Sequence, residues 1–161
     1  MRSKNCKTII LSGSIGSGKS TALMDWIKNN KACGFVTPTV DNKKMLYDIC
    51  TAAYYDYEIE GGKDDSISIG KYFLSRKAFE IAERIIEDAI KSTCNCFVLD
   101  EVGKLELKEE GHYKGFLNLL DLFSGTLLLV VREQLVRDVI EKFVLEDCII
   151  LSVDQIRNYH P

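Results

Sequence analysis

The sequence has no apolar run long enough to cross a bilayer. Its longest ones, residues 126–131 and 148–153, are far shorter than the ~20 apolar residues that a membrane-spanning helix needs. It also has no excess of positive charge, because 21 Lys and Arg face 24 Asp and Glu for a net charge of −3. This charge balance gives no electrostatic reason to expect binding to nucleic acid or to anionic membranes. We therefore expect neither as a partner.

The sequence also offers little material for a zinc site. It has only two histidines, His112 and His160, and no CxxC pair. Several of its six cysteines lie in apolar, strand-like runs, which is typical of small buried thiols. We therefore expect free thiols in a reducing compartment, rather than zinc ligands or disulfides. The cysteines are Cys6, Cys33, Cys50, Cys94, Cys96 and Cys148.

No internal repeat, low-complexity tract or linker divides the 161 residues. This length is typical of one domain with a real core, so we predict a single domain over residues 1–161 and expect a monomer. The N-terminus begins with basic residues and then turns apolar, which faintly resembles a signal peptide. Its apolar part is only residues 8–11 and leads directly into a glycine loop. We interpret it as a strand and the protein as cytoplasmic.

Strand-like and helix-like segments alternate along the chain. Short apolar runs predict buried strands at residues 7–12, 34–37, 96–99, 126–131 and 148–153. Amphipathic periodicity predicts helices at residues 19–30, 76–93, 112–123 and 134–143, with Ser75 capping the second. This alternation predicts a three-layer α/β fold, in which helices cover both faces of a mainly parallel central sheet.

Residues 43–68 break the alternation. Residues 45–59 are rich in Tyr, Ile and Thr and have little helical period. We predict a β-hairpin or small antiparallel flap inserted after the second strand, with Gly61 and Gly62 in a turn. Tyr54, Tyr55 and Tyr57 could stack on a nucleotide base, although an aromatic strand face is the commoner meaning of such a run.

Residues 13–20 read GSIGSGKS, the full Walker A pattern, placed between a predicted strand and a predicted helix. Its glycines permit backbone angles that let successive N–H groups and the helix N-terminus surround an anion. Lys19 is expected on the β- and γ-phosphates, Ser20 on Mg²⁺ and Thr21 near the α-phosphate. An ordinary glycine-rich turn is the alternative. The expected nucleotide-binding residues are Gly13, Ser14, Ile15, Gly16, Ser17, Gly18, Lys19, Ser20 and Thr21.

Two carboxylates, Asp100 and Glu101, directly follow the apolar run 96–99. They fall at the carboxyl edge of a predicted parallel sheet, where ligands bind. Asp100 fits a Walker B ligand of Mg²⁺, and Glu101 is placed to orient and deprotonate the attacking water. A solvated acidic turn is the alternative.

Phosphoryl transfer gains greatly from a cation on the γ-phosphate. Arg132 is the best candidate within the chain, because it ends the strand predicted at residues 126–131. Arg84 and Arg137 lie in amphipathic helices and are expected in solvent. A surface role for Arg132, with slow turnover or an arginine from a partner, is the alternative. The other arginines are Arg2, Arg76 and Arg157.

Residues 100–107, DEVGKLEL, closely resemble the DEIGKMEL signature of the thermophile-type nucleoside-triphosphatase family. Residues 34–38, GFVTP, and 70–72, GKY, resemble further segments of that family in the same order. The resemblance implies a RecA-like P-loop fold and slow, Mg²⁺-dependent hydrolysis of ATP, GTP and other nucleoside triphosphates. It assigns phosphate and metal binding to Lys19, Ser20 and Asp100, and the catalytic carboxylate to Glu101.

The chain departs from the family pattern in segments expected to contact the base. Thr39 stands where the family has Glu, and residues 42–49 lack an expected arginine and glycine. Arg157 lacks the usual preceding asparagine. Lys104 and Glu106 match the signature without a derivable role, and a Lys–Glu pair that braces the loop is one interpretation.

Two functions other than hydrolysis fit a phosphate-binding loop. A small-molecule or nucleotide kinase suits the small size, although no arginine-rich lid segment is evident. A non-catalytic nucleotide switch could use residues 45–59 as its contact surface. No NKxD or other base-reading motif is present, so the sequence leaves the preferred nucleotide open.

Overall fold

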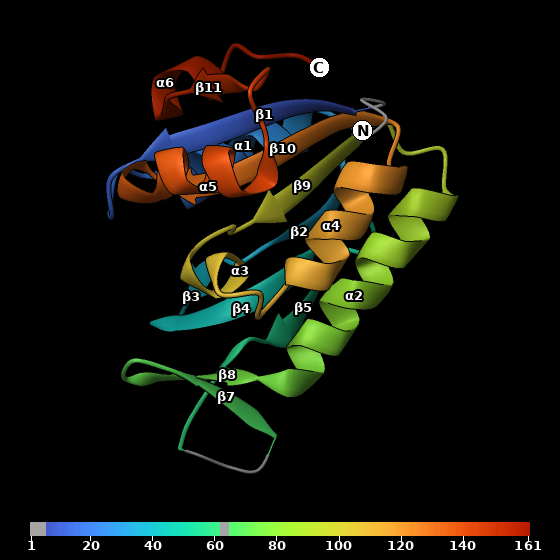
Figure 1. The fold of residues 1–161 in the computed structure, drawn as a ribbon. Coiled ribbons are helices and arrows are strands. Elements are labelled where there is room, and N and C mark those ends of the chain that lie inside the picture. The colour runs from blue at the N-terminus through green and yellow to red at the C-terminus, as the bar shows by residue number, and fades with distance from the viewer. Residues whose placement is uncertain (1–5, 62–64) are drawn as a thin grey trace.

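The computed structural model describes residues 6–61 and 65–161, and its centre is a twisted sheet (Figure 1). Within these residues the sheet has eight strands, in the order β11-β1-β10-β9-β2-β4-β3, with β5 paired to β4. The strands from β11 to β2 run parallel to one another. These parallel strands are β1 (Cys6–Gly13), β2 (Cys33–Val36), β9 (Cys96–Asp100), β10 (Gly125–Arg132) and β11 (Ile149–Leu151).

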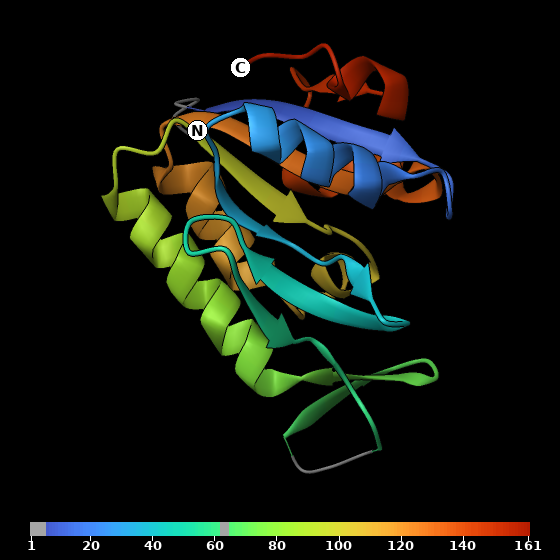
Figure 2. The same cartoon turned by 180° about the vertical axis from the view of Figure 1, so that it is seen from behind.

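Helices cover both faces of the sheet, as Figures 1 and 2 show from opposite sides. One face carries α1 (Lys19–Asn29) and the short α6 (Val153–Ile156). The other carries α2 (Arg76–Lys91), α4 (Tyr113–Leu122) and α5 (Val136–Phe143). Two short elements lie near the strand ends, α3 (Lys104–Leu107) and the 3₁₀ helix η1 (Glu133–Leu135). No helix in the described ranges has the length and apolarity to cross a membrane.

The core follows from the alternation of side chains along buried strands. In β1, Ile9 and Leu11 pack under α1, whereas Ile10 packs on the opposite face. Residues 126–131 of β10 are buried throughout, because helices lie on both sides of that strand. The three-layer fold predicted from the sequence is therefore confirmed.

Helix α2 shows how closely local signals set an element. It begins after Ser75, whose hydroxyl accepts a hydrogen bond from the backbone N–H of Ala78 at 3.3 Å, as its predicted N-cap role requires. Its apolar stripe, including Phe79, Ala82 and Ile86, is buried against the sheet and α4. The helix ends at Lys91, two residues before the predicted end.

Residues 39–61 and 65–75 contribute antiparallel strands in two groups (Figure 2). The first extends the central sheet through β3 (Thr39–Val40), β4 (Lys43–Asp48) and β5 (Ala53–Asp56). The second is a separate sheet of β6 (Glu58–Ile59), β8 (Tyr72–Ser75) and β7 (Ser66–Ile69). Of the predicted Gly61–Gly62 turn, Gly62 lies outside the described residues.

The predicted tyrosine run has mixed surroundings. Tyr57 is buried, Tyr55 is half-buried, and Tyr54 is exposed with its ring centroid 4.7 Å from that of Tyr47. The three side chains therefore do not form one stacking surface.

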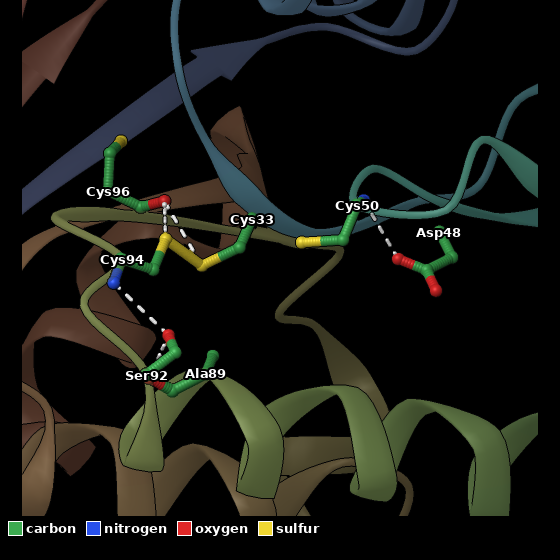
Figure 3. Close-up of a disulfide and its surroundings, with 7 residues drawn as sticks. All are labelled: Cys33, Asp48, Cys50, Ala89, Ser92, Cys94 and Cys96. Atoms are coloured by element: carbon green, nitrogen blue, oxygen red, sulfur yellow. Dashed lines mark hydrogen bonds between the residues drawn. A yellow bond between two sulfur atoms is a disulfide. The ribbon is translucent and has the colours of Figure 1, made fainter.

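The expectation that all six cysteines are free thiols is wrong. Cys33 and Cys94 form a disulfide, with their Cα atoms 6.4 Å apart (Figure 3). Cys33 opens β2 and Cys94 lies just before β9, and these two strands pair in parallel. Sheet pairing therefore brings together two residues that are 61 positions apart in sequence. The other four cysteines are free: Cys6, Cys50, Cys96 and Cys148.

Candidate active site

The Walker A loop connects the end of β1 to the start of α1. Gly16 and Gly18 have positive φ values of 75° and 85°, which favour glycine. A Cβ atom on Gly13 would lie 2.6 Å from the Ser17 hydroxyl oxygen, so a side chain there would force Ser17 to move. No side chain caps α1 at Gly18. The N–H groups of its first turn are therefore available to an anion.

Lys19 folds back over this loop. Its ammonium donates to the carbonyl oxygens of Gly13 at 2.9 Å and Ser14 at 2.7 Å. These bonds hold a positive charge against the loop. The remaining loop residues, from Ser14 to Gly18, are exposed, as are Ser20 and Thr21. The loop thus presents an open, positively charged cradle of the kind that binds phosphate.

Asp100 ends β9 and is 4% exposed. The backbone N–H of Thr37 donates to its Oδ2 at 3.0 Å, and the Thr37 hydroxyl lies 3.5 Å from the same oxygen. Burial raises the pKa of Asp100 to about 6, and the Thr37 hydrogen bonds and the charge of Lys44 oppose that rise. Thr37 was not among the predicted site residues, although it belongs to the GFVTP segment that the family resemblance had singled out.

Glu101 and Arg132 meet at the carboxyl ends of two adjacent strands. The Arg132 Nε atom lies 3.1 Å from Glu101 Oε1. Arg132 is also the register partner of Gly13 on the other neighbouring strand, β1. The pair therefore lies beside the start of the Walker A loop, at the sheet edge where ligands of parallel α/β folds bind.

The segment after Glu101 is held in place by a second carboxylate. Glu106 is 3% exposed and accepts two backbone hydrogen bonds at 2.9 Å, from the N–H groups of Gly103 and His112. Burial raises the pKa of Glu106 to about 7. The Lys104–Glu106 brace considered from the sequence is therefore replaced by a brace between Glu106 and the backbone, and Lys104 is exposed.

A buried aromatic cluster supports this segment from beneath. The His112 ring is 2% exposed and lies 4.9 Å from the Phe35 ring and 4.6 Å from the Phe79 ring, centroid to centroid. The Tyr57 hydroxyl is 3.5 Å from His112 Nε2, and burial lowers the pKa of His112 to about 3. The histidine is therefore a neutral core residue at physiological pH, packed under the loop.

A magnesium ion fits the chemistry of this edge. Asp100 is a buried carboxylate whose hydrogen bonds come from Thr37, and Ser20 provides a hydroxyl at the start of α1. Within the described ranges no group of three or more His, Cys, Asp or Glu residues is arranged to hold a metal. Mg²⁺ suits such a sparse set, because it keeps several waters and takes further ligands from substrate phosphates.

The remaining described arginines lie in solvent. Arg137 is exposed and pairs with Glu141 at 2.8 Å, and Arg84 on α2 is exposed, as the sequence had predicted. Arg76 and Arg157 are exposed as well. Arg2 lies outside the described residues. Arg132 is thus the described arginine whose partner is the candidate catalytic carboxylate.

Comparison with known proteins gives a family match and a similar fold. A family model described as NTPase matches residues 8–159. The fold is similar to that in the crystal structure of THEP1 from the hyperthermophile Aquifex aeolicus, with a TM-score of 0.71 and 18% sequence identity. That similarity covers 91% of this chain and 89% of the other. No curated protein matches the sequence.

Proposed function

Since the chain belongs to the NTPase family whose model it matches, we propose that it hydrolyses nucleoside triphosphates to diphosphate and phosphate with Mg²⁺, at the edge formed by the Walker A loop, Asp100, Glu101 and Arg132. The observation that carries this proposal is the Glu101–Arg132 pair, at 3.1 Å, beside the start of that loop. Hydrolysis needs a base for water and a cation for the γ-phosphate, and the pair offers both.

The Walker A loop supplies binding. Backbone N–H groups between Gly13 and Thr21 would surround the phosphates, and Lys19 would turn from its carbonyl partners to the β- and γ-phosphates. Ser20 and Asp100 would hold Mg²⁺, which neutralises charge on the phosphates when bound. Thr37 would keep the Asp100 carboxylate oriented through its backbone N–H.

Glu101 would perform the chemical step. It accepts a proton from water, the water oxygen forms a bond to the γ-phosphorus, and the bond to the β–γ bridging oxygen breaks. The electron pair of that bond leaves with the diphosphate. Arg132 orients Glu101 before reaction and supplies positive charge as the transferred group separates.

The direct test replaces the base and retains the binding loop. Glu101→Gln should bind nucleotide as the wild type does and lose at least about 100-fold in phosphate release, the size expected for a general base. Glu110→Gln, which removes an exposed carboxylate three residues after the end of α3, is the matched control. Wild-type turnover by Glu101→Gln would refute the assignment.

We further propose broad specificity that includes ATP and GTP, because the sequence shows no base-reading motif. Initial rates for a panel of nucleoside triphosphates would test it, and a strong preference for one base would contradict it.

A cytoplasmic location fits this activity, because nucleoside triphosphates are held in the cytoplasm. We also propose a single domain over residues 1–161, with residues 43–68 as an inserted flap, acting as a monomer without nucleic acid.

A further inference from the structure

A pocket of about 480 Å³ adjoins the Glu101–Arg132 pair. Its walls come from Ile15 at the tip of the Walker A loop, residues 37–44, residues 57–58, the β7–β8 hairpin, the segment that follows β9, and the end of β10 with η1. These parts are far apart in sequence and meet only in the folded protein. The pocket is therefore a feature of the whole architecture rather than of one loop.

The size of this pocket exceeds what hydrolysis requires. A water molecule occupies ~30 Å³ in the liquid, whereas pockets for small organic ligands measure roughly 300–1,000 Å³. At about 480 Å³ the pocket falls in the second class. The attacking water alone does not explain its volume.

The position of the pocket separates it from the expected nucleoside. Thr21, expected near the α-phosphate, does not line it, whereas Glu101 and Arg132 do. These two residues belong to the γ-phosphate end of a bound triphosphate. A nucleotide held by the loop would therefore point its γ-phosphate toward the pocket and its base away from it.

The lining favours an anion with an apolar body. Much of the pocket wall is apolar or aromatic. The apolar side chains are Ile69, Leu74, Leu105 and Leu135, and the aromatic ones are Tyr57 and Tyr72. Such surfaces suit a ring-sized group, with a few polar contacts to fix its orientation.

Two lysines give the pocket positive charge that can bind an anionic group. Lys44 and Lys104 line the pocket, and neither ammonium has an ion-pair partner within 4 Å among the residues that the structure describes. The facing carboxylates of Glu101 and Glu106 are already engaged, by Arg132 and by two backbone N–H groups. Glu58 accepts the backbone N–H of Lys44 at 3.4 Å. The charge of Lys44 also acts on Asp100, but no ion pair among the described residues holds either ammonium, so both lysines can approach an anionic group.

We propose that this pocket is a second small-molecule site, which binds an organic anion with a flat aromatic ring, of the class of nucleoside monophosphates, beside the γ-phosphate of the bound triphosphate. The inference rests on the proposed function for the position of the triphosphate. In this arrangement the ring lies against Leu74 and Tyr72, and its anionic group lies near Lys44 and Lys104.

Titration calorimetry with AMP, GMP, CMP and UMP tests the site, using the full chain saturated with Mg²⁺ and a non-hydrolysable ATP analogue. At least one monophosphate should bind the wild type. Ile69→Trp, which narrows the pocket, and Lys44→Ala, which removes a cation, should each weaken binding by about tenfold or more, as expected for loss of space or of a charge-assisted contact. Leu122→Trp, at an exposed position on α4, should bind normally.

Two results would overturn the inference. One is that none of the four monophosphates binds the wild type. The other is that the pocket holds the nucleoside of the substrate itself, in which case Ile69→Trp raises the KM for ATP and leaves that for inorganic tripolyphosphate unchanged. Under the proposal, Ile69→Trp leaves both KM values unchanged. Hydrolysis of ATP by the wild type, with Glu101→Gln as control, tests the proposed function separately.

Discussion

Arg132 and Glu101 form an ion pair across the ends of β10 and β9, with Nε 3.1 Å from Oε1 and side chains 33% and 28% exposed. An ion pair this open to solvent contributes little to stability. The ion pair instead matters for geometry, because it holds the candidate base next to the candidate cation, beside the start of the Walker A loop.

Arg132→Ala should therefore lower kcat far more than it changes the unfolding free energy. We expect a loss on the order of 100-fold in kcat, the size seen when one donor to a developing anion is removed. Arg132→Lys should recover part of the rate, because it restores the charge without the planar guanidinium. Steady-state phosphate release measures both. Arg137→Ala, at an exposed arginine paired with Glu141, should behave as the wild type. Unchanged kcat in Arg132→Ala would point to an arginine from a partner.

Thr37 gives a prediction about the metal. Removal of its hydroxyl in Thr37→Val keeps the backbone N–H on Asp100, so the free Mg²⁺ concentration for half-maximal rate should rise by about tenfold or less, the lower end for an outer-shell partner. Asp100→Asn, which removes the charge, should raise it further. Rates measured across a Mg²⁺ titration report both shifts. Thr93→Val, at an exposed threonine, is the control, and an equal shift there would contradict the assignment.

The sequence predicted the elements of this edge better than their connections. Glycine spacing and apolar runs placed the Walker A loop and Asp100 at strand ends, because those signals are local. The Thr37–Asp100 bond and the Cys33–Cys94 disulfide each join residues more than 60 positions apart, through the pairing of β2 with β9. Pairing of distant strands is set by the whole sheet, and a single sequence without structure does not reveal which strands are neighbours.

Glu106 yields a test of the loop brace. Gln at this position has one acceptor oxygen where Glu has two, so Glu106→Gln should leave the N–H of Gly103 or His112 without its partner. We expect a loss of roughly 1–3 kcal/mol in unfolding free energy, the cost of an unsatisfied buried group. Because the brace positions the segment after Glu101, kcat should also fall while the KM for nucleotide changes little. Glu109→Gln, which alters an exposed carboxylate of the same turn, is the matched control. A rise in KM with unchanged kcat would argue for a binding role instead.

His112 predicts how stability changes with pH. Its pKa is lowered to about 3 in the folded chain, from 6.5 in the unfolded chain, so below pH 6.5 the unfolded chain takes up a proton that the folded chain does not. Stability is therefore full above pH 6.5 and falls with pH, by ~2 kcal/mol at pH 5 from this group alone. Asp100 and Glu106 have raised pKa values, so these two groups make the folded chain more stable as the pH falls. The contribution of His112 is therefore measured as the difference between the wild type and a variant that lacks the imidazole ring.

His112→Phe should remove that contribution. A phenyl ring fits among Phe35 and Phe79 and has no proton to gain, so urea unfolding at pH 7, 6 and 5 should show a smaller loss than in the wild type. His160→Gln, at an exposed histidine, should retain the wild-type slope. Parallel pH profiles for the wild type and His112→Phe would show that the ring is not buried as a neutral group.

The Cys33–Cys94 disulfide gives the sharpest test of the fold and of its compartment. It joins residues 61 positions apart, and closing a loop of that length removes entropy from the unfolded chain worth ~4 kcal/mol. Cys94→Ser should therefore lower the urea midpoint, and a reducing agent should lower that of the wild type equally. Cys50→Ser, at an exposed free thiol, should have the same urea midpoint as the wild type, both with and without the reducing agent.

Alkylation without reductant, followed by intact mass, counts the thiols directly. Four modified cysteines in the unfolded wild type mean that the bond exists, and six mean that all are thiols, as the sequence had suggested. Disulfides are rare in reducing cytosol, so the same count on protein taken from its native cells also tests the proposed location. A disulfide that persists there would show either that the compartment is oxidising or that the burial of Cys33 protects the bond from reductants.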